Sequence, residues 1–119
     1  MDAVSVIREY YRTIDEGDYE TLSSILTESF TQERSDRRFD GRDSFVAFMK
    51  DERPRTDTEH DIDRIFETST REDESGASQD DEIAVEGAVY YPDGERWFGF
   101  VDVFEIKDDR LASLRTYTK

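Results

Sequence analysis

The sequence predicts a single α+β domain over residues 1–119, with amphipathic helices first and a curved antiparallel sheet folded around them. Two observations support this fold class. Apolar residues recur at helical spacing in the first part of the chain and alternate at strand spacing in the second part. In addition, 119 residues can bury the core of one domain but not of two.

The first expected helix covers residues 4–15. Its apolar face consists of Val4, Ile7, Tyr10, Tyr11 and Ile14. Asp2 suits its start, because a carboxylate accepts a hydrogen bond from a free backbone N–H, and Gly17 suits its end. Asp18 then caps a short second helix. The buried side of that helix carries Leu22, Ile25 and Leu26.

A short strand is expected over residues 29–34, with Phe30 as its apolar anchor. Asp40 and Gly41 open a third helix with a broad apolar stripe. The stripe consists of Phe45, Val46, Phe48 and Met49. This helix must end before Pro54, since proline lacks the N–H group that a helix interior requires.

Strand patterns dominate the rest of the chain. The expected strands cover residues 60–68, 82–91, 96–106 and 111–118. Between the first two, residues 71–81 are mainly acidic residues, Ser and Gly, which bury too little surface to order themselves. We expect a mobile hairpin tip there.

The turn at Asp93 and Gly94 predicts a register, because Asp-Gly suits the two central positions of a type I′ turn. The predicted pairs are Val85 with Asp102, Gly87 with Phe100, Val89 with Phe98 and Tyr91 with Arg96. Asp102 then interrupts a sheet face that is otherwise apolar. The opposite face is also apolar and carries Trp97, so we expect a homodimer through this outer face.

The next turn, over residues 107–110, leaves two registers open for the last strand. A two-residue loop places one set on the Asp102 face, namely Ser113, Arg115 and Tyr117. One additional bulge residue exchanges them for Leu114, Thr116 and Thr118.

Charge narrows the classes of partner. Acidic residues outnumber basic ones by 31 to 16, and the net charge is -15. Such a chain repels phosphate backbones and anionic membranes, so we expect no nucleic-acid and no membrane partner. An acidic surface that is poor in lysine suits a cytosol of molar salt, where the Debye length is ~3 Å. This indicates an extreme halophile of haloarchaeal type, with an ordinary acidic mesophile protein as the alternative.

Several site classes are excluded by composition. The chain has no cysteine, which rules out disulfides, thiolate metal sites and a cysteine nucleophile. Its one histidine cannot form a histidine-rich metal site. No run approaches the ~20 apolar residues of a membrane-spanning helix, and no basic segment followed by an apolar one opens the chain. We therefore expect a cytoplasmic protein with no metal and no cofactor.

Five segments resemble, in order and spacing, the nuclear transport factor 2-like superfamily, and most closely its SnoaL-like branch. They are residues 10–19 (YYRTIDEGDY), 39–45 (FDGRDSF), 84–87 (AVEG), 100–104 (FVDVF) and 110–117 (RLASLRTY). That branch includes polyketide cyclases, and ketosteroid isomerases are more distant relatives. The resemblance implies a cone-shaped, cystatin-like fold whose curved sheet wraps a deep pocket closed by helices, and which commonly dimerises through the outer sheet face.

In the isomerase pattern, a tyrosine of the first helix and an aspartic acid of a long strand donate hydrogen bonds to a developing enolate, while another carboxylate takes the proton. The resemblance places these donors at Tyr10 and Asp102. The base falls on or beside Arg34, which stays protonated and cannot serve. Glu33 or Asp36 could replace it only if the strand slips or the loop folds inward.

Asp102 has two interpretations. In an apolar cavity, desolvation disfavours the carboxylate, so the retained proton would make Asp102 a general acid or hydrogen-bond donor. Alternatively, Asp102 pairs with Arg115 or Arg34 and anchors the sheet. Tyr10 is likewise either a catalytic donor or a core residue with a satisfied hydroxyl, and the neighbouring Tyr11 could take either place.

His60 completes the candidate catalytic residues. It is flanked by acidic residues, which suits either a solvated salt bridge or a proton shuttle. Arg34, Arg37 and Arg38 form a polar loop that could overhang the pocket and receive an anionic ligand, or pair with carboxylates. The residues expected to bind a ligand are Phe30, Arg34, Phe45, Met49, Val85, Phe98, Phe100, Phe104 and Arg115.

Three functions fit this sequence. The leading one is a SnoaL-like pocket protein for a small apolar molecule, with isomerase- or cyclase-type acid/base chemistry on a carbonyl compound. The second is a ligand-binding module without catalysis. The third is a dimeric interaction protein whose pocket is filled by side chains.

Overall fold

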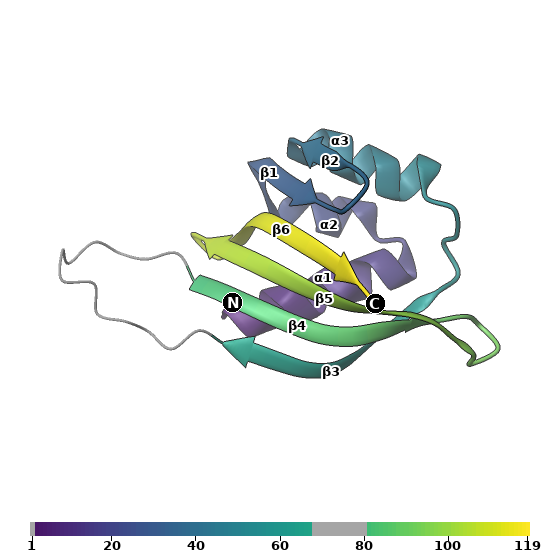
Figure 1. Ribbon diagram of the computed structural model, residues 1–119. Coiled ribbons are helices and arrows are strands. Elements are labelled where there is room, and N and C mark those ends of the chain that lie inside the picture. Colours follow the sequence, from purple (N-terminus) through teal and green to yellow (C-terminus); the bar gives the residue numbers. More distant parts are fainter. Residues whose placement is uncertain (1, 68–80) are drawn as a thin grey trace.

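A six-stranded sheet curves around the helices of this α+β domain, as the sequence predicts (Figure 1). The computed structural model describes residues 2–67 and 81–119. Its helices are α1 (Ala3–Glu16), α2 (Tyr19–Ser24) and α3 (Arg42–Ala47), and α3 continues into a π-helical turn, η1 (Phe48–Glu52). Its strands are β1 (Leu26–Glu33), β2 (Arg38–Asp40), β3 (Glu59–Glu67), β4 (Asp81–Tyr90), β5 (Arg96–Lys107) and β6 (Arg110–Thr118).

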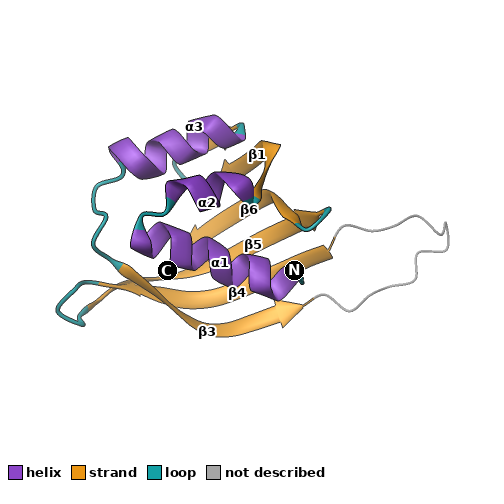
Figure 2. Cartoon of the chain, turned by 180° about the vertical axis from the view of Figure 1, so that it is seen from behind, coloured by secondary structure: helices purple, strands orange, loops and turns teal. Residues whose placement is uncertain are grey.

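The strands lie side by side in the order β2-β1-β6-β5-β4-β3. Neighbouring strands are antiparallel except β1 and β6, which are parallel. Figure 2 shows the three α-helices lying across one face of this sheet. The predicted hairpin tip at residues 71–81 falls outside the described residues, apart from Asp81 at the start of β4. No helix in the described part of the chain is long and apolar enough to cross a bilayer.

The caps predicted for the first two helices are confirmed. Asp2 accepts a hydrogen bond from the Ser5 backbone N–H at 2.8 Å, and Gly17 ends α1 in the left-handed conformation with a φ of 71°. Asp18 caps α2 by accepting from the Thr21 N–H at 3.2 Å. These helices press their apolar sides against the sheet, and together they enclose the hydrophobic core.

The structure departs from the predicted elements around residues 26–54. Leu26 begins β1 instead of lining α2, where a six-residue helix is too short for its period to separate helix from strand. The expected third helix is divided between α3 and η1. It is preceded by β2, a three-residue strand that the sequence pattern did not indicate because three residues are too few to show alternation.

The predicted register of β4 and β5 is confirmed for Val85 with Asp102, Gly87 with Phe100 and Val89 with Phe98. The predicted pair of Tyr91 with Arg96 is wrong, because a bulge after Val89 pairs Tyr90 with Arg96 instead. Pro92 explains the shift. Proline favours the second position of a type I turn, and the Gly94 N–H accordingly donates to the Tyr91 carbonyl at 2.9 Å with Gly94 at a φ of 91°.

The β5–β6 hairpin combines both features that the sequence left open. Asp108 and Asp109 form a two-residue loop with φ values of 52° and 62°. A bulge between Glu105 and Ile106 then shifts the register, so that Asp102 pairs with Thr116. The Asp102 face of β6 therefore carries Leu114, Thr116 and Thr118, and Arg115 lies on the opposite face.

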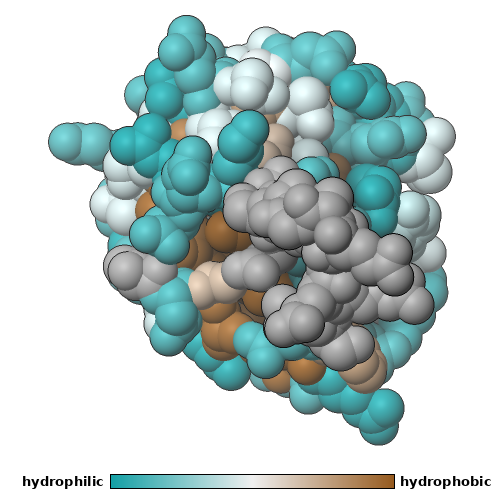
Figure 3. All heavy atoms as spheres, turned by 90° about the vertical axis from the view of Figure 1, so that its left-hand side faces the viewer, coloured by the Kyte–Doolittle hydropathy of each residue, from teal (hydrophilic) through white to brown (hydrophobic). Residues whose placement is uncertain are grey.

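The surface reflects the acidic composition. On the end of the molecule that Figure 3 faces, hydrophilic side chains cover most of the described surface, and apolar side chains gather in a smaller area. This distribution is expected for a chain in which 39% of the residues are charged.

Candidate functional site

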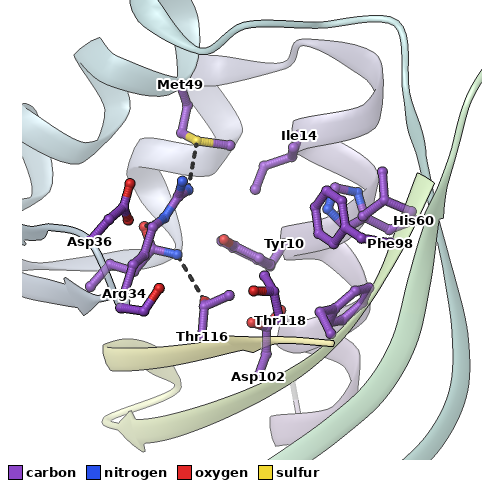
Figure 4. A pocket seen from close by; sticks show the side chains of 14 residues that line it. Tyr10, Ile14, Arg34, Asp36, Met49, His60, Phe98, Asp102, Thr116 and Thr118 are labelled. Atoms are coloured by element: carbon purple, nitrogen blue, oxygen red, sulfur yellow. Dashed lines mark hydrogen bonds between the residues drawn. The ribbon is translucent and has the colours of Figure 1, made fainter.

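A cavity of about 430 Å³ opens between the concave face of the sheet and the helices (Figure 4). This volume lies within the range of small-molecule sites. The lining residues are Tyr10, Ile14, Gln32, Arg34, Ser35, Asp36, Met49, His60, Val89, Phe98, Phe100, Asp102, Thr116 and Thr118. The cavity thus combines an apolar wall with a small number of polar and ionisable groups.

Asp102 lies in the wall of this cavity with 5% of its surface exposed. The Tyr11 hydroxyl donates a hydrogen bond of 2.6 Å to its Oδ2 atom. The other carboxyl oxygen, Oδ1, is buried and has no hydrogen-bond partner among the described residues. A buried carboxyl group normally satisfies both oxygens, so the unpartnered Oδ1 distinguishes Asp102 from an ordinary buried carboxyl group.

The pKa of Asp102 is raised above its ordinary value, because burial removes water from the charged form. The hydrogen bond from Tyr11 acts against this rise, as do the Thr116 hydroxyl and the more distant charges of His60 and Arg34. Neither Arg34 nor Arg115 pairs with Asp102. Asp102 therefore retains its proton to a higher pH than an exposed carboxyl group does.

The two adjacent tyrosines of α1 have different positions. The Tyr11 hydroxyl donates to Asp102, whereas the Tyr10 ring lines the cavity and stacks against Phe45 at 6.4 Å between centroids. Successive helical residues are about 100° apart around the axis, so the two side chains point in different directions although both rings contact Phe104. Burial raises the pKa of both hydroxyls well above 10, and both are therefore neutral hydrogen-bond donors at physiological pH.

His60 also lines the cavity, and it is held by Asp15 of α1. The His60 Nδ1 atom lies 2.6 Å from Asp15 Oδ1, and the His60 backbone N–H donates to Asp15 Oδ2 at 3.0 Å. A carboxylate can only accept, so Nδ1 carries the proton in this pair. In neutral His60 the lone pair then belongs to Nε2, which makes no hydrogen bond to the described residues.

A line of hydrogen bonds runs from Arg34 across the cavity floor. The Arg34 Nε–H donates to Gln32 Oε1 at 2.9 Å, and Gln32 Nε2 donates to Thr116 Oγ1 at 3.0 Å. These two bonds determine the orientation of the Gln32 amide. Because Thr116 pairs with Asp102 across the sheet, the line ends beside the buried carboxyl group.

Three residues of the site, Gln32, Thr116 and Asp15, were not predicted from the sequence. Gln32 had a detectable signal, since it lies two residues after Phe30 and two before Arg34 and therefore shares their face at strand spacing, where its side chain is buried. The position of Thr116 could not be predicted, because the sequence left two registers open for the last strand. Nothing local indicates Asp15, whose partner His60 is 45 residues away.

The structure brings together seven of the predicted site residues along the cavity. These are Tyr10, Arg34, Met49, His60, Phe98, Phe100 and Asp102. Four others, Phe30, Phe45, Val85 and Phe104, lie in the closed core with no exposed surface, because the helices pack directly onto them. Arg115 is on the outer face, 3.6 Å from Glu82, as the β-bulge requires.

Metal binding has no support from the described residues, where no group of three histidines or carboxylates is arranged to hold an ion.

Comparison with solved structures shows the fold. The chain superposes on an NTF2-like protein of unknown function from Cytophaga hutchinsonii with a TM-score of 0.76 and 11% identity, over 100% of this chain and 91% of the other. A protein from Kribbella flavida that is assigned as a ketosteroid isomerase has a TM-score of 0.74 and 19% identity, over 97% and 76% of the two chains. An LEH-like epoxide hydrolase from M. tuberculosis has a TM-score of 0.73 and 21% identity, over 98% and 82%.

Among curated proteins, none matches the sequence. A family model does match, and it spans residues 7–114, from α1 to β6. This range includes every residue of the cavity except Thr116 and Thr118. The chain belongs to the SnoaL-like domain family, within the NTF2-like superfamily.

Proposed function

We propose that this protein binds a small, largely apolar carbonyl compound and moves a proton between two of its carbon atoms. The proposal rests on the surroundings of the Asp102 side chain. Its carboxyl group is buried in the cavity wall, is held through Oδ2 by Tyr11 and has an unpartnered Oδ1. A protonated Asp102 can donate a hydrogen bond to a carbonyl oxygen.

The proposed roles follow from the contacts of each group. His60 is the base: its Nε2 lone pair removes a proton from the carbon next to the carbonyl, and Asp15 holds the resulting imidazolium. The negative charge that develops on the carbonyl oxygen is stabilised by hydrogen bonds from Asp102 and Tyr10. His60 then returns the proton to another carbon, which completes an isomerisation.

The wall of the cavity supports an apolar ligand. Phe98, Phe100 and Val89 line it on the sheet side, and Ile14 and Met49 on the helix side. A rigid ring system would bury its faces against these side chains and present its carbonyl oxygen to the polar floor.

Proton abstraction is tested with 2-acetylnaphthalene in D₂O, where enolisation exchanges the methyl protons for deuterons and NMR measures the rate. We expect catalysed exchange by the unaltered protein and a loss of about 100-fold or more in His60→Gln and in Asp102→Asn. Asp43→Asn, which removes an exposed carboxylate, serves as the matched control. Binding of the ketone without catalysed exchange would refute the catalytic role and favour a ligand-binding module.

We also propose a homodimer formed through the outer sheet face. Three large side chains are exposed among the described residues: Phe66 at 51%, Trp97 at 40% and Tyr117 at 55%. The register places all three on the face that the helices do not cover, where covering them would remove apolar surface from water. Light scattering should give twice the chain mass for the unaltered protein and the chain mass for Trp97→Glu. A monomer at all concentrations would refute this assembly.

Finally, we propose that the protein works in the cytoplasm of a halophile. The net charge of -15 and the presence of only three lysines support this setting. The melting temperature should rise steeply between dilute buffer and molar KCl, as counter-ions screen the repulsion among carboxylates. Indifference of the melting temperature to KCl would refute the halophilic origin.

A further inference from the structure

Arg34 has a positive charge without a carboxylate partner among the described residues. Several other arginines lie beside an acidic side chain, as Arg12, Arg38 and Arg55 do. The Arg34 side chain lies in the cavity wall instead, in a chain that has 31 acidic residues with which to pair it. Asp36, which also lines the cavity, lies 3.7 Å from Arg37.

The guanidinium group of Arg34 is held in position. Its Nε–H donates to Gln32, and its Nη2 lies 4.0 Å from the Met49 sulfur. A thioether sulfur is a weak hydrogen-bond acceptor. The group also lies over the rings of Phe39 and Phe48, at 5.7 and 5.4 Å from their centroids. These contacts orient the plane of the guanidinium and leave Nη1 without a hydrogen bond to the described residues.

Arg34 and Asp102 lie at different places in the wall of the same cavity. Figure 4 shows Arg34 beside Met49 on one side, Phe98 and His60 on the opposite side, and Asp102 at the floor between them. The hydrogen bonds through Gln32 and Thr116 connect the two places along the floor. A ligand that fills the cavity would therefore meet a cation at one end and a buried acid at the floor.

We propose that the ligand carries a carboxylate that Arg34 binds, away from the carbonyl group that faces Asp102. A planar guanidinium with free N–H donors matches a carboxylate in charge and in geometry, and the resulting hydrogen bonds are stronger than those between neutral groups. The inference rests on the proposed function, because the position of Asp102 determines where the carbonyl group of the ligand lies.

Two probes with the same apolar body test the charge at Arg34. They are 2-naphthoate, a carboxylate, and 2-acetylnaphthalene, a neutral ketone, with binding measured by calorimetry at one fixed KCl concentration. The variants are Arg34→Met and, as the matched control, Arg37→Met. Both substitutions remove one positive charge, and both guanidinium groups lie over Phe48, but Arg37 has a carboxylate beside it. Circular dichroism verifies that each variant is folded.

The unaltered protein should bind 2-naphthoate about tenfold or more tightly than 2-acetylnaphthalene. Arg34→Met should abolish this preference while the affinity for the ketone stays within about twofold, and Arg37→Met should preserve it. Three results would overturn the proposal: no preference for the carboxylate, an equal loss in both variants, or no binding of 2-naphthoate.

Asp102→Asn separates this inference from the proposed function. If Asp102 faces the carbonyl group, this variant weakens binding of 2-acetylnaphthalene. That result can hold even when Arg34→Met has no effect, in which case the carboxylate assignment alone fails. Conversely, unchanged ketone binding in Asp102→Asn together with a lost carboxylate preference in Arg34→Met would retain the anion site and reject the role of Asp102.

Discussion

Replacing Tyr11 with Phe tests whether the hydrogen bond to Asp102 stabilises the fold. The substitution keeps the ring, which packs against Phe100 and Phe104, and removes only the hydroxyl group. The lost bond is 2.6 Å long and buried, and its acceptor is an ionisable carboxyl oxygen. Bonds to charged groups contribute about 1.5–3 kcal/mol, so the free energy of unfolding should fall by that amount where Asp102 is ionised.

This loss converts into a measurable melting shift. Unfolding entropies of about 2.1 cal/mol/K per residue give about 250 cal/mol/K for 119 residues, so each kcal/mol lowers the melting temperature by about 4 °C. Tyr11→Phe should therefore melt about 6–12 °C lower at a pH high enough to ionise Asp102 in the folded protein. Because Tyr11 lowers the pKa of Asp102, the loss should shrink as acid protonates that carboxyl group.

Tyr10→Phe is the matched control, since Tyr10 is the adjacent buried tyrosine and its hydroxyl makes no hydrogen bond to the described residues. We expect its free energy of unfolding to change by less than about 0.5 kcal/mol. Urea unfolding followed by circular dichroism measures both variants across pH. Equal losses in the two variants, or no loss in Tyr11→Phe, would show that the Tyr11 bond contributes nothing specific to stability.

Three further predictions concern stability. Burial raises the pKa of Asp102 in the folded protein above its ordinary value of 3.8. The stability that the protonated Asp102 carboxyl group contributes is therefore fully present below pH 3.8 and is lost as pH rises through the folded pKa. Asp102→Asn should therefore gain stability relative to the unaltered protein between acid and neutral pH, and urea titrations showing a constant difference would contradict this. Gly87→Ala should lower the free energy of unfolding by more than about 2 kcal/mol, because the added Cβ would lie 2.3 Å from the Asp61 carbonyl oxygen and 2.8 Å from the Phe100 ring. An unchanged melting temperature would show that β3 moves away from the added methyl group at no cost. The double variant Asp108→Asn with Asp109→Gly should gain about 1 kcal/mol, since both residues have positive φ and Asn-Gly favours this turn. A lower melting temperature for the double variant would mean that the aspartates make contacts worth more than the backbone strain.

The sequence by itself determined most of the helices and strands outside residues 26–54, and the face on which Asp102 lies. Local rules are sufficient for both, since the caps at Asp2 and Gly17 and the periodicity of the apolar residues depend on a few neighbouring residues. The alternation along β4 and β5 was also sufficient to pair Val85 with Asp102, although Pro92 displaced the turn itself.

Only the tertiary structure decided which groups surround that carboxyl group. The bulge at Glu105 turned Thr116 toward Asp102 and Arg115 away from it, and its position depends on how β6 meets β1 and β5. The choice between Tyr10 and Tyr11, and the pairing of His60 with Asp15, likewise depend on how α1 lies against the sheet. Such contacts join residues that are 45 to 91 positions apart, and packing of the whole core sets them, which no local pattern encodes.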